Sequence, residues 1–201
     1  MAAIKTHYGV SLCLFWLISA SALAAEGDGL YGRLDGDFAY SIAAGAGLEL
    51  NEEHRGFAVA DLRLRYLDSI GLVAAAEMRA SDEYHLISAL DLRPLFLWRF
   101  FTNRSSQERY IDLWIDSFGL EIGTVTVLSE GEAALGLVLG TGFDLPILLG
   151  KGSSGLFIRF GFRYQHGLGS EHAGSLSTFD DFTSYALLSF KDFFKLFSYR
   201  N

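Results

Sequence analysis

Acidic and basic residues alternate with apolar ones along three stretches of this chain, which predicts one charged face shared by several β-strands. A period of two places every second side chain on the same side of a strand. Because this face carries both signs, its charges can neutralise one another in a narrow interior. An ion-selective path or a gating network is the alternative, and we favour the neutralised interior. The predicted charge network consists of Asp61, Arg63, Arg65, Asp91, Arg93, Arg159 and Arg163.

A histidine and a serine near the C-terminus form the pattern that most suggests catalysis. His166 ends a predicted strand, and Ser170 follows it in a loop rich in glycine, serine and acidic residues. An imidazole that takes the proton of a serine hydroxyl makes that serine a nucleophile, and Glu171 or Asp180 could orient the ring. Ser170 would have to fold back from its loop to reach His166. We therefore favour a protein without a catalytic site and keep hydrolysis as an alternative.

The other histidines and the single cysteine suggest no metal or cofactor. His54, His85 and His172 have spacings that fit no known metal site. The sequence has no phosphate-binding loop, no G-x-S-x-G elbow and no zinc signature. Cys13, the only cysteine, lies in the N-terminal segment. The formal net charge of −8 argues against nucleic acid as a partner.

The first 25 residues have the features of a secretory signal peptide. A lysine precedes an apolar run over residues 8–20, and residues 22–24 (Ala-Leu-Ala) resemble a cleavage site. The run is shorter than the roughly 18–20 residues of a membrane-spanning helix, although an uncleaved anchor is the alternative. We assign residues 1–25 to a signal peptide and residues 26–201 to one exported domain.

That domain contains eight stretches with strand-like alternation, which predicts an all-β fold. Short turns join most neighbours, as in an antiparallel up-and-down meander, and such a meander can close and leave no free edge. Residues 191–201 form a tail whose role the sequence leaves open. The predicted strands are residues 30–48, 56–67, 70–79, 85–100, 118–128, 133–148, 155–166 and 182–190.

One short amphipathic helix is expected over residues 106–116, between the fourth and fifth strands. Another strand is the alternative for this segment. The acidic side chains of Glu108, Asp112 and Asp116 weaken any attraction of the helix to anionic lipid. We therefore expect the helix to pack onto the protein.

A barrel of two-faced strands holds its apolar face inside if it is soluble and outside if it spans a membrane. Eight strands enclose a space only about wide enough for side chains, which the many aromatic residues of this chain would overfill. Tyr66, Trp98 and Tyr164 lie near strand ends, where aromatic residues form interfacial girdles. We therefore predict an eight-stranded antiparallel up-and-down transmembrane β-barrel.

In strand pattern, strand count and turn lengths, residues 28–190 resemble the small eight-stranded outer-membrane β-barrel proteins of Gram-negative bacteria. The resemblance implies insertion into the cell outer membrane, with outer-membrane lipid as partner and both termini and the helix in the periplasm. It implies a structural or surface-interaction role, and the Gly167–Asp181 loop is the expected place for a surface ligand. Such barrels usually end on an aromatic residue, a part that Phe190 can play although eleven residues follow it.

Two alternative functions remain open. His166 loosely resembles the strand histidine of outer-membrane lipid A deacylase barrels, in which a serine nucleophile follows two residues later. Leu168 stands at that place here, so the motif is broken. The other alternative is a soluble periplasmic lipocalin-like carrier, whose apolar face would line a ligand cavity.

Overall fold

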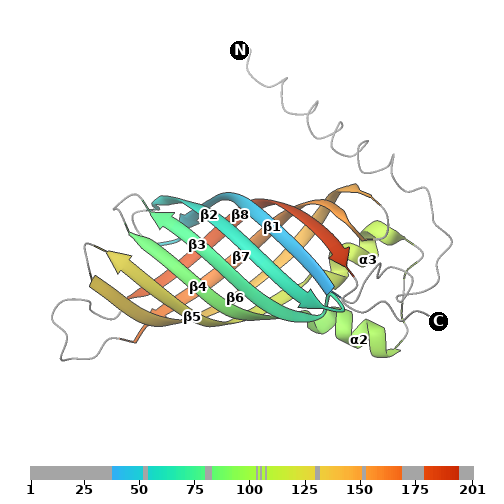
Figure 1. Cartoon of the computed structure of the whole chain (residues 1–201), viewed down its shortest axis with the longest axis horizontal. Coiled ribbons are helices and arrows are strands. Elements are labelled where there is room, and N and C mark those ends of the chain that lie inside the picture. The colour runs from blue at the N-terminus through green and yellow to red at the C-terminus, as the bar shows by residue number, and fades with distance from the viewer. Residues whose placement is uncertain are drawn as a thin grey trace, which may run out of the picture.

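Eight antiparallel strands close into a barrel in which each strand pairs with its neighbours in sequence and β8 pairs with β1 (Figure 1). The structure is a computed structural model, and it describes residues 38–51, 54–79, 83–102, 104, 106, 108–129, 132–150, 153–168 and 179–194. The predicted all-β up-and-down barrel, with a short helical element between the fourth and fifth strands, is confirmed. The elements are β1 (Phe38–Glu49), β2 (Gly56–Tyr66), β3 (Ile70–Arg79), β4 (Tyr84–Leu92), α2 (Pro94–Thr102), α3 (Arg109–Asp116), β5 (Gly119–Ser129), β6 (Glu132–Leu149), β7 (Gly155–Gly167) and β8 (Asp180–Phe194).

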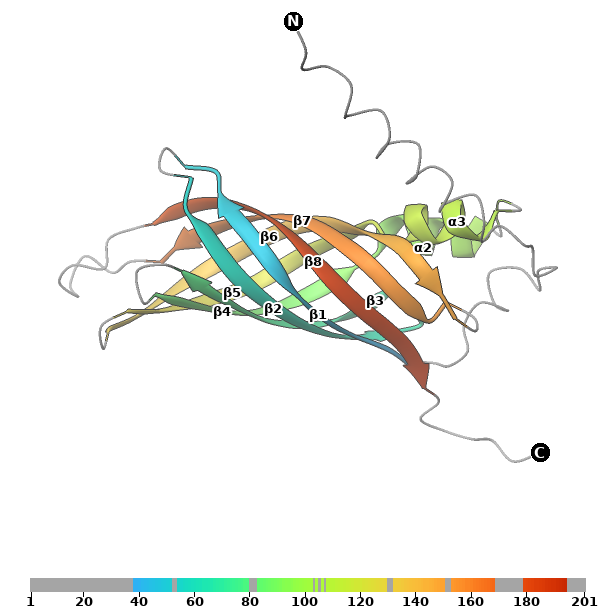
Figure 2. The same cartoon turned by 90° about the horizontal axis from the view of Figure 1, so that it is seen from above.

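The register of the strands makes them slant around the barrel (Figure 2). Leu156 of β7 connects through paired residues on β8, β1, β2, β3, β4 and β5 to Leu137 of β6, which pairs with His166 of β7. The circuit returns to β7 ten residues beyond its start, from 156 to 166. With the usual strand spacing and rise, this stagger gives a tilt of about 40° to the barrel axis.

A three-residue turn between β2 and β3 decides which face of β3 is inside. Leu67 and Asp68 have positive φ angles of 48° and 51°. The backbone N–H of Ser69 donates to the carbonyl of Tyr66 at 3.0 Å, and the Ser69 hydroxyl donates to the same oxygen at 2.9 Å. Because a shift of one residue would turn every side chain of β3 to the other face, this turn places Glu77 inside the barrel.

The predicted strand over residues 85–100 is wrong beyond Leu92, where β4 ends and α2 follows. Pro94 is the first residue of α2, a position where the missing N–H costs nothing and the fixed φ suits a helix. Phe96 and Phe100 lie four residues apart, and their ring centroids are 5.8 Å from each other. A spacing of four fits both a strand face and a helix face, so alternation alone could not separate them. Trp98, expected on a strand, therefore lies on a helix.

The chain ends of the described barrel also differ from the expected ones. The helix predicted over 106–116 is found as α3, which begins at Arg109. β8 continues to Phe194, so residues 191–194 belong to the last strand and not to a tail. The predicted signal peptide (1–25) and the start of the predicted strand 30–48 lie outside the described residues. In the described part of the chain, neither helix has the length and hydropathy needed to span a membrane.

Candidate functional site

The interior of the barrel is lined by every second side chain of its strands, and many of these are charged. In β2, Asp61, Arg63 and Arg65 are buried while Leu62 and Leu64 are exposed. Among the described barrel residues, the number of buried acids equals the number of buried bases, so the interior is neutral overall. The acids are Glu49, Asp61, Asp68, Glu77, Asp91, Glu121 and Asp144, and the bases are Arg63, Arg65, Arg79, Arg93, Arg159, Arg163 and Lys191.

Asp61 is the central carboxylate, because it joins three guanidinium groups from two strands. Arg63 donates from Nε to Oδ1 at 2.8 Å and from Nη2 to Oδ2 at 2.8 Å. Arg159 donates from Nη1 at 2.7 Å, and Arg163 from Nη2 at 3.4 Å. Charge-assisted hydrogen bonds of this kind are stronger than neutral ones, so β2 and β7 are cross-linked through a single side chain.

Arg163 extends the network across the barrel to β3 and β5. Its Nη1 donates to Oε1 of Glu77 at 3.2 Å, and its Nε donates to Oε2 of Glu121 at 3.0 Å. The guanidinium carbon lies 4.5 Å from the centroid of the Tyr185 ring, a cation–π distance. Gln165 donates to the other oxygen of Glu77 at 3.0 Å. Each charge in this half therefore has more than one partner.

The network continues to the end of the barrel that carries the helices. Arg93 donates to Asp68 at 2.9 Å and to Asp144 at 2.7 Å, and Nζ of Lys191 donates to Asp68 at 2.7 Å. Arg159 reaches Oδ1 of Asp144 at 2.6 Å. Burial alone would raise the pKa of the Asp68 carboxyl in its turn, but the cations of Arg93 and Lys191 outweigh burial and hold that pKa below its usual range.

The structure places all seven residues of the predicted network inside the barrel. Among them, Nε of Arg65 donates to Oδ2 of Asp91 at 2.5 Å. The prediction missed five of the seven buried acids and two of the seven buried bases. Glu49, Glu77, Glu121 and Asp144 keep the period of two in their own strands, so the same rule could have found them, whereas Asp68 lies in the β2–β3 turn. The sequence alone does not settle whether the β2–β3 turn has two or three residues, and the face of Glu77 depends on that length.

Side chains fill the middle of the barrel. The hollow among Arg63, Asp91 and Arg159 measures about 10 Å³, which is room for roughly one water molecule. Two apolar clusters occupy opposite walls and complete the packing. The first is Val73, Ala75, Ile87, Ala89, Val125, Val127 and Val138, and the second is Ala43, Phe57, Val59, Tyr185 and Leu187.

The outer wall is the reverse of the interior. His166 and Asp180 lie at one rim of the outer wall, and Asp192 lies at the other. Between these rims, the described outward-facing positions of the eight strands carry no charged side chain. One row of paired residues crosses five neighbouring strands with side chains that are 42–60% exposed, and it consists of Leu64, Leu72, Leu90, Ile122 and Leu139. This row belongs to an uncharged belt on the outer wall, and its apolar side chains are continuous over β2, β3, β4, β5 and β6.

Aromatic rings gather at both rims of the belt. At the rim near the chain ends, the Phe38 ring lies 5.4 Å from Tyr66 and 5.6 Å from Phe194. At the opposite rim, the rings of Tyr164 and Phe182 lie 4.7 Å apart. Tyr66 and Tyr164 each join an apolar ring to a polar hydroxyl, which is typical of a boundary between water and an apolar phase.

Comparison with known proteins gives no family for this chain. No family model, curated protein or solved structure matches it.

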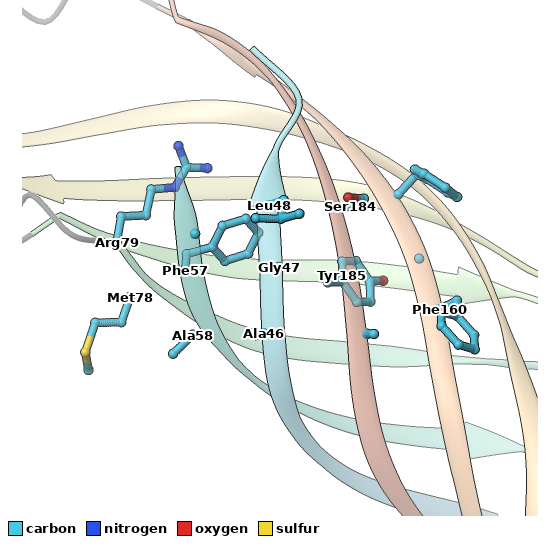
Figure 3. A pocket seen from close by; sticks show the side chains of 14 residues that line it. Ala46, Gly47, Leu48, Phe57, Ala58, Met78, Arg79, Phe160, Ser184 and Tyr185 are labelled. Atoms are coloured by element: carbon cyan, nitrogen blue, oxygen red, sulfur yellow. The ribbon is translucent and has the colours of Figure 1, made fainter. Parts of the chain in front are cut away.

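The outer wall is hollowed over β8, β1 and β2, where small side chains replace large ones (Figure 3). Ala46 pairs with Ala58 on one side and with Ala186 on the other. Phe160 and Met78 stand at the two sides of the hollow, which has a volume of about 870 Å³. Its apolar lining suits a flexible hydrocarbon chain.

The candidate catalytic histidine lies on the outer side of the rim. Nδ1 of His166 lies 2.7 Å from Oδ1 of Asp180, and the Tyr164 hydroxyl donates to the same oxygen at 2.8 Å. Ser170, the expected nucleophile, and Glu171 lie outside the described residues.

The histidines that the structure describes do not converge on a metal site. His85 is fully buried, with Nδ1 2.6 Å from Oε1 of Gln165 and Nε2 against Glu83. His166 faces outward, and His54 lies in the segment between β1 and β2. Among the described residues, no group of three metal-binding side chains is found. His172 lies outside the described residues.

Proposed function

We propose that this chain is an integral outer-membrane β-barrel protein whose role is structural or lies in surface interaction through its loops. The observation that carries the proposal is the inversion of polarity, with charges inside the barrel and an uncharged apolar belt outside. The two classes of eight-stranded barrel differ in this respect.

The cost of exposing the apolar side chains of the belt to water supports lipid as their surroundings. Apolar surface in water costs about 25 cal/mol per Å², and the largest apolar patch on a soluble monomer is usually about 300–600 Å². The described outer wall is uncharged between its rims on all eight strands, and such a belt is larger than a patch of this kind. Lipid around the belt removes this cost, while the interior charges keep their partners.

The orientation in the membrane is part of the proposal. Phe38, where β1 begins, and Phe194, where β8 ends, lie at the same end of the barrel as α2 and α3 (Figure 1). We assign this end to the periplasm and the opposite loops to the outside, with a surface ligand expected at Gly167–Asp181. An exported chain with a leader over residues 1–25 fits this assignment.

The filled interior supports a barrel without an open pore. Ion pairs between β2, β3, β5 and β7 cross the space through which ions would have to pass. The purified protein in a planar bilayer should therefore give no stable single-channel conductance. A steady ohmic conductance would contradict this part of the proposal.

Cell fractionation with a gel-mobility test decides the membrane location. We expect the protein in the outer-membrane fraction, with different mobilities for boiled and unboiled samples because a closed barrel resists detergent until heated. Recovery in the soluble periplasmic fraction would overturn the proposal. The lipocalin-like carrier would then need an apolar cavity, whereas the described interior is charged.

A lipid hydrolase is the second candidate, because His166 is paired with Asp180 on the outer side of the rim, where lipid ester bonds would lie. A carboxylate that orients an imidazole is one half of a nucleophile-activating arrangement. Lipid A deacylation by the purified protein, abolished in His166→Ala, would support it. Absence of activity, or activity unchanged in His166→Ala, would exclude His166 from this role.

A further inference from the structure

The two helices between β4 and β5 form a hairpin that is held together by a buried cation. Nη1 of Arg99 on α2 donates to Oδ1 of Asp116 on α3 at 2.7 Å, and its Nη2 pairs with Asp112. Nη1 also reaches the Asp112 carbonyl at 3.3 Å. All three side chains are buried, so the hairpin has a fixed geometry.

The opposite side of the hairpin is apolar and exposed. Phe101 is 80% exposed and Trp98 is 53% exposed on α2, while Trp114 is 48% exposed on α3. Leu95 and Ile111, at 40% and 43% exposed, lie three residues before Trp98 and Trp114 and so share a helix face with them. Large rings with this exposure are rare on a soluble surface unless something covers them.

The charges of the hairpin favour contact with lipid more than the sequence indicated. Two of the three acids that argued against it, Asp112 and Asp116, are buried and share the Arg99 guanidinium, so neither carboxylate is displayed on the exposed side of the hairpin. Glu108 remains exposed. On the outer side, the guanidinium carbon of Arg104 lies 5.3 Å from the centroid of the Trp98 ring. An arginine beside a tryptophan is a usual pair at the level of lipid headgroups.

The apolar side of the hairpin is continuous with the outer wall of the barrel. The Trp114 ring meets the Phe143 ring of β6 edge-on at 6.5 Å, and Phe143 lies 5.5 Å from Phe160 of β7. Both phenylalanines occupy outward positions of their strands. A solvent that covers the belt therefore reaches the hairpin without a break.

We propose that the α2–α3 hairpin is an interfacial anchor, with Trp98, Phe101 and Trp114 inserted at the headgroup boundary of the periplasmic leaflet. An amphipathic helix binds in this way when its apolar face lies in the plane of the interface. The inference rests on the proposed membrane location and adds a lipid contact outside the barrel wall. It commits to the bilayer as occupant, and a protein partner on the same face is an outcome of the test.

The two tryptophans make the test direct. The sequence has three tryptophans, and Trp16 lies within residues 1–25. Without that leader, the intrinsic tryptophan emission comes from Trp98 and Trp114 alone. Trp114→Phe isolates Trp98, and Trp98→Phe isolates Trp114. The barrel is reconstituted in phosphatidylcholine vesicles whose acyl chains carry bromine near the headgroup or near the chain end.

We expect bromine near the headgroup to reduce the emission of each single-tryptophan variant at least twofold, and bromine near the chain end to have less effect. Tyr84→Trp, made without the two native tryptophans, is the matched control, because Tyr84 lies on the outer wall at the other rim. The inference would be overturned if the control were quenched while the emission of Trp98 and Trp114 stayed unchanged. The same result is expected if a second copy or another protein covers the hairpin. Failure of the control together with loss of the mobility shift would instead reject the membrane barrel itself.

Discussion

Replacing Asp61 by asparagine removes one charge from the centre of the barrel and keeps the shape of the side chain. Three arginines then lose a carboxylate at distances of 2.7–3.4 Å. Removing one partner of a buried ion pair costs about 3–5 kcal/mol, because the remaining charge stays buried without compensation. We therefore expect Asp61→Asn to be strongly destabilising.

The remaining partners place the loss near the lower end of that range. Arg63 and Arg163 both keep Glu121, and Arg159 keeps Asp144. We expect a loss of about 3 kcal/mol in the free energy of unfolding. With a urea dependence of about 1–3 kcal/mol per molar, this corresponds to a midpoint lower by about 1–3 M.

The folded fraction can be measured as the unboiled gel band after incubation with urea in detergent. Asp180→Asn is the matched control, since it makes the same chemical change on an exposed rim residue. Substitutions of exposed residues usually change stability by less than about 0.5 kcal/mol. Equal midpoints for the two variants would refute the view that the charge network holds the barrel together.

A double-mutant cycle with Arg159→Gln separates the pair from general damage. Asp61→Asn together with Arg159→Gln removes one charge of each sign, and Asp144 still has Arg93 at 2.7 Å. The double variant should therefore lose less than the sum of the single variants, by about 0.5–3 kcal/mol. Strict additivity would show that the two side chains act independently.

Three further perturbations test other parts of the structure. Gly45→Val should prevent formation of the heat-modifiable form, because a Cβ there would lie 2.2 Å from the carbonyl oxygen of Ala186, whereas Gly56→Ala, with its nearest neighbour at 3.9 Å, should assemble normally. Asp68→Asn should lower the urea midpoint at pH 7, and the gap to the native protein should narrow as the pH falls below about 4. The sign follows from the lowered pKa of Asp68, since such a group stabilises the fold above its unfolded pKa and loses that contribution as pH falls through the folded value. Leu62→Lys, in the middle of the belt, should cost about 2–4 kcal/mol in lipid vesicles, and an unchanged unfolding midpoint there would contradict lipid contact at this position.

The strands and the charge network were predictable because the period of two is strong in this chain. Asp61, Arg63 and Arg65 share one parity in β2, and the structure places all three inside. The eight strands followed from the same pattern, with boundaries that differ by one or two residues at most turns.

The misread segments are those where two patterns coincide. Phe96, Trp98 and Phe100 alternate like a strand, yet the first and last are also one helical turn apart, and only Pro94 marked the start of a helix. At the C-terminus, Lys191 resembles a basic tail residue. Its place inside the barrel depends on Asp68, which lies 123 residues earlier, and no local pattern contains that contact.

The contacts that are distant in sequence also link closure of the barrel to neutralisation of its interior. All the buried acids of the described barrel precede β7, whereas three of the seven buried bases, Arg159, Arg163 and Lys191, lie on β7 and β8. A chain with only its first six strands in place therefore has an inner face with excess negative charge, which water solvates and hydrocarbon does not. The last two strands supply the missing cations and the last hydrogen-bonded edge together. Closure of the sheet and neutralisation of its interior are thus one step.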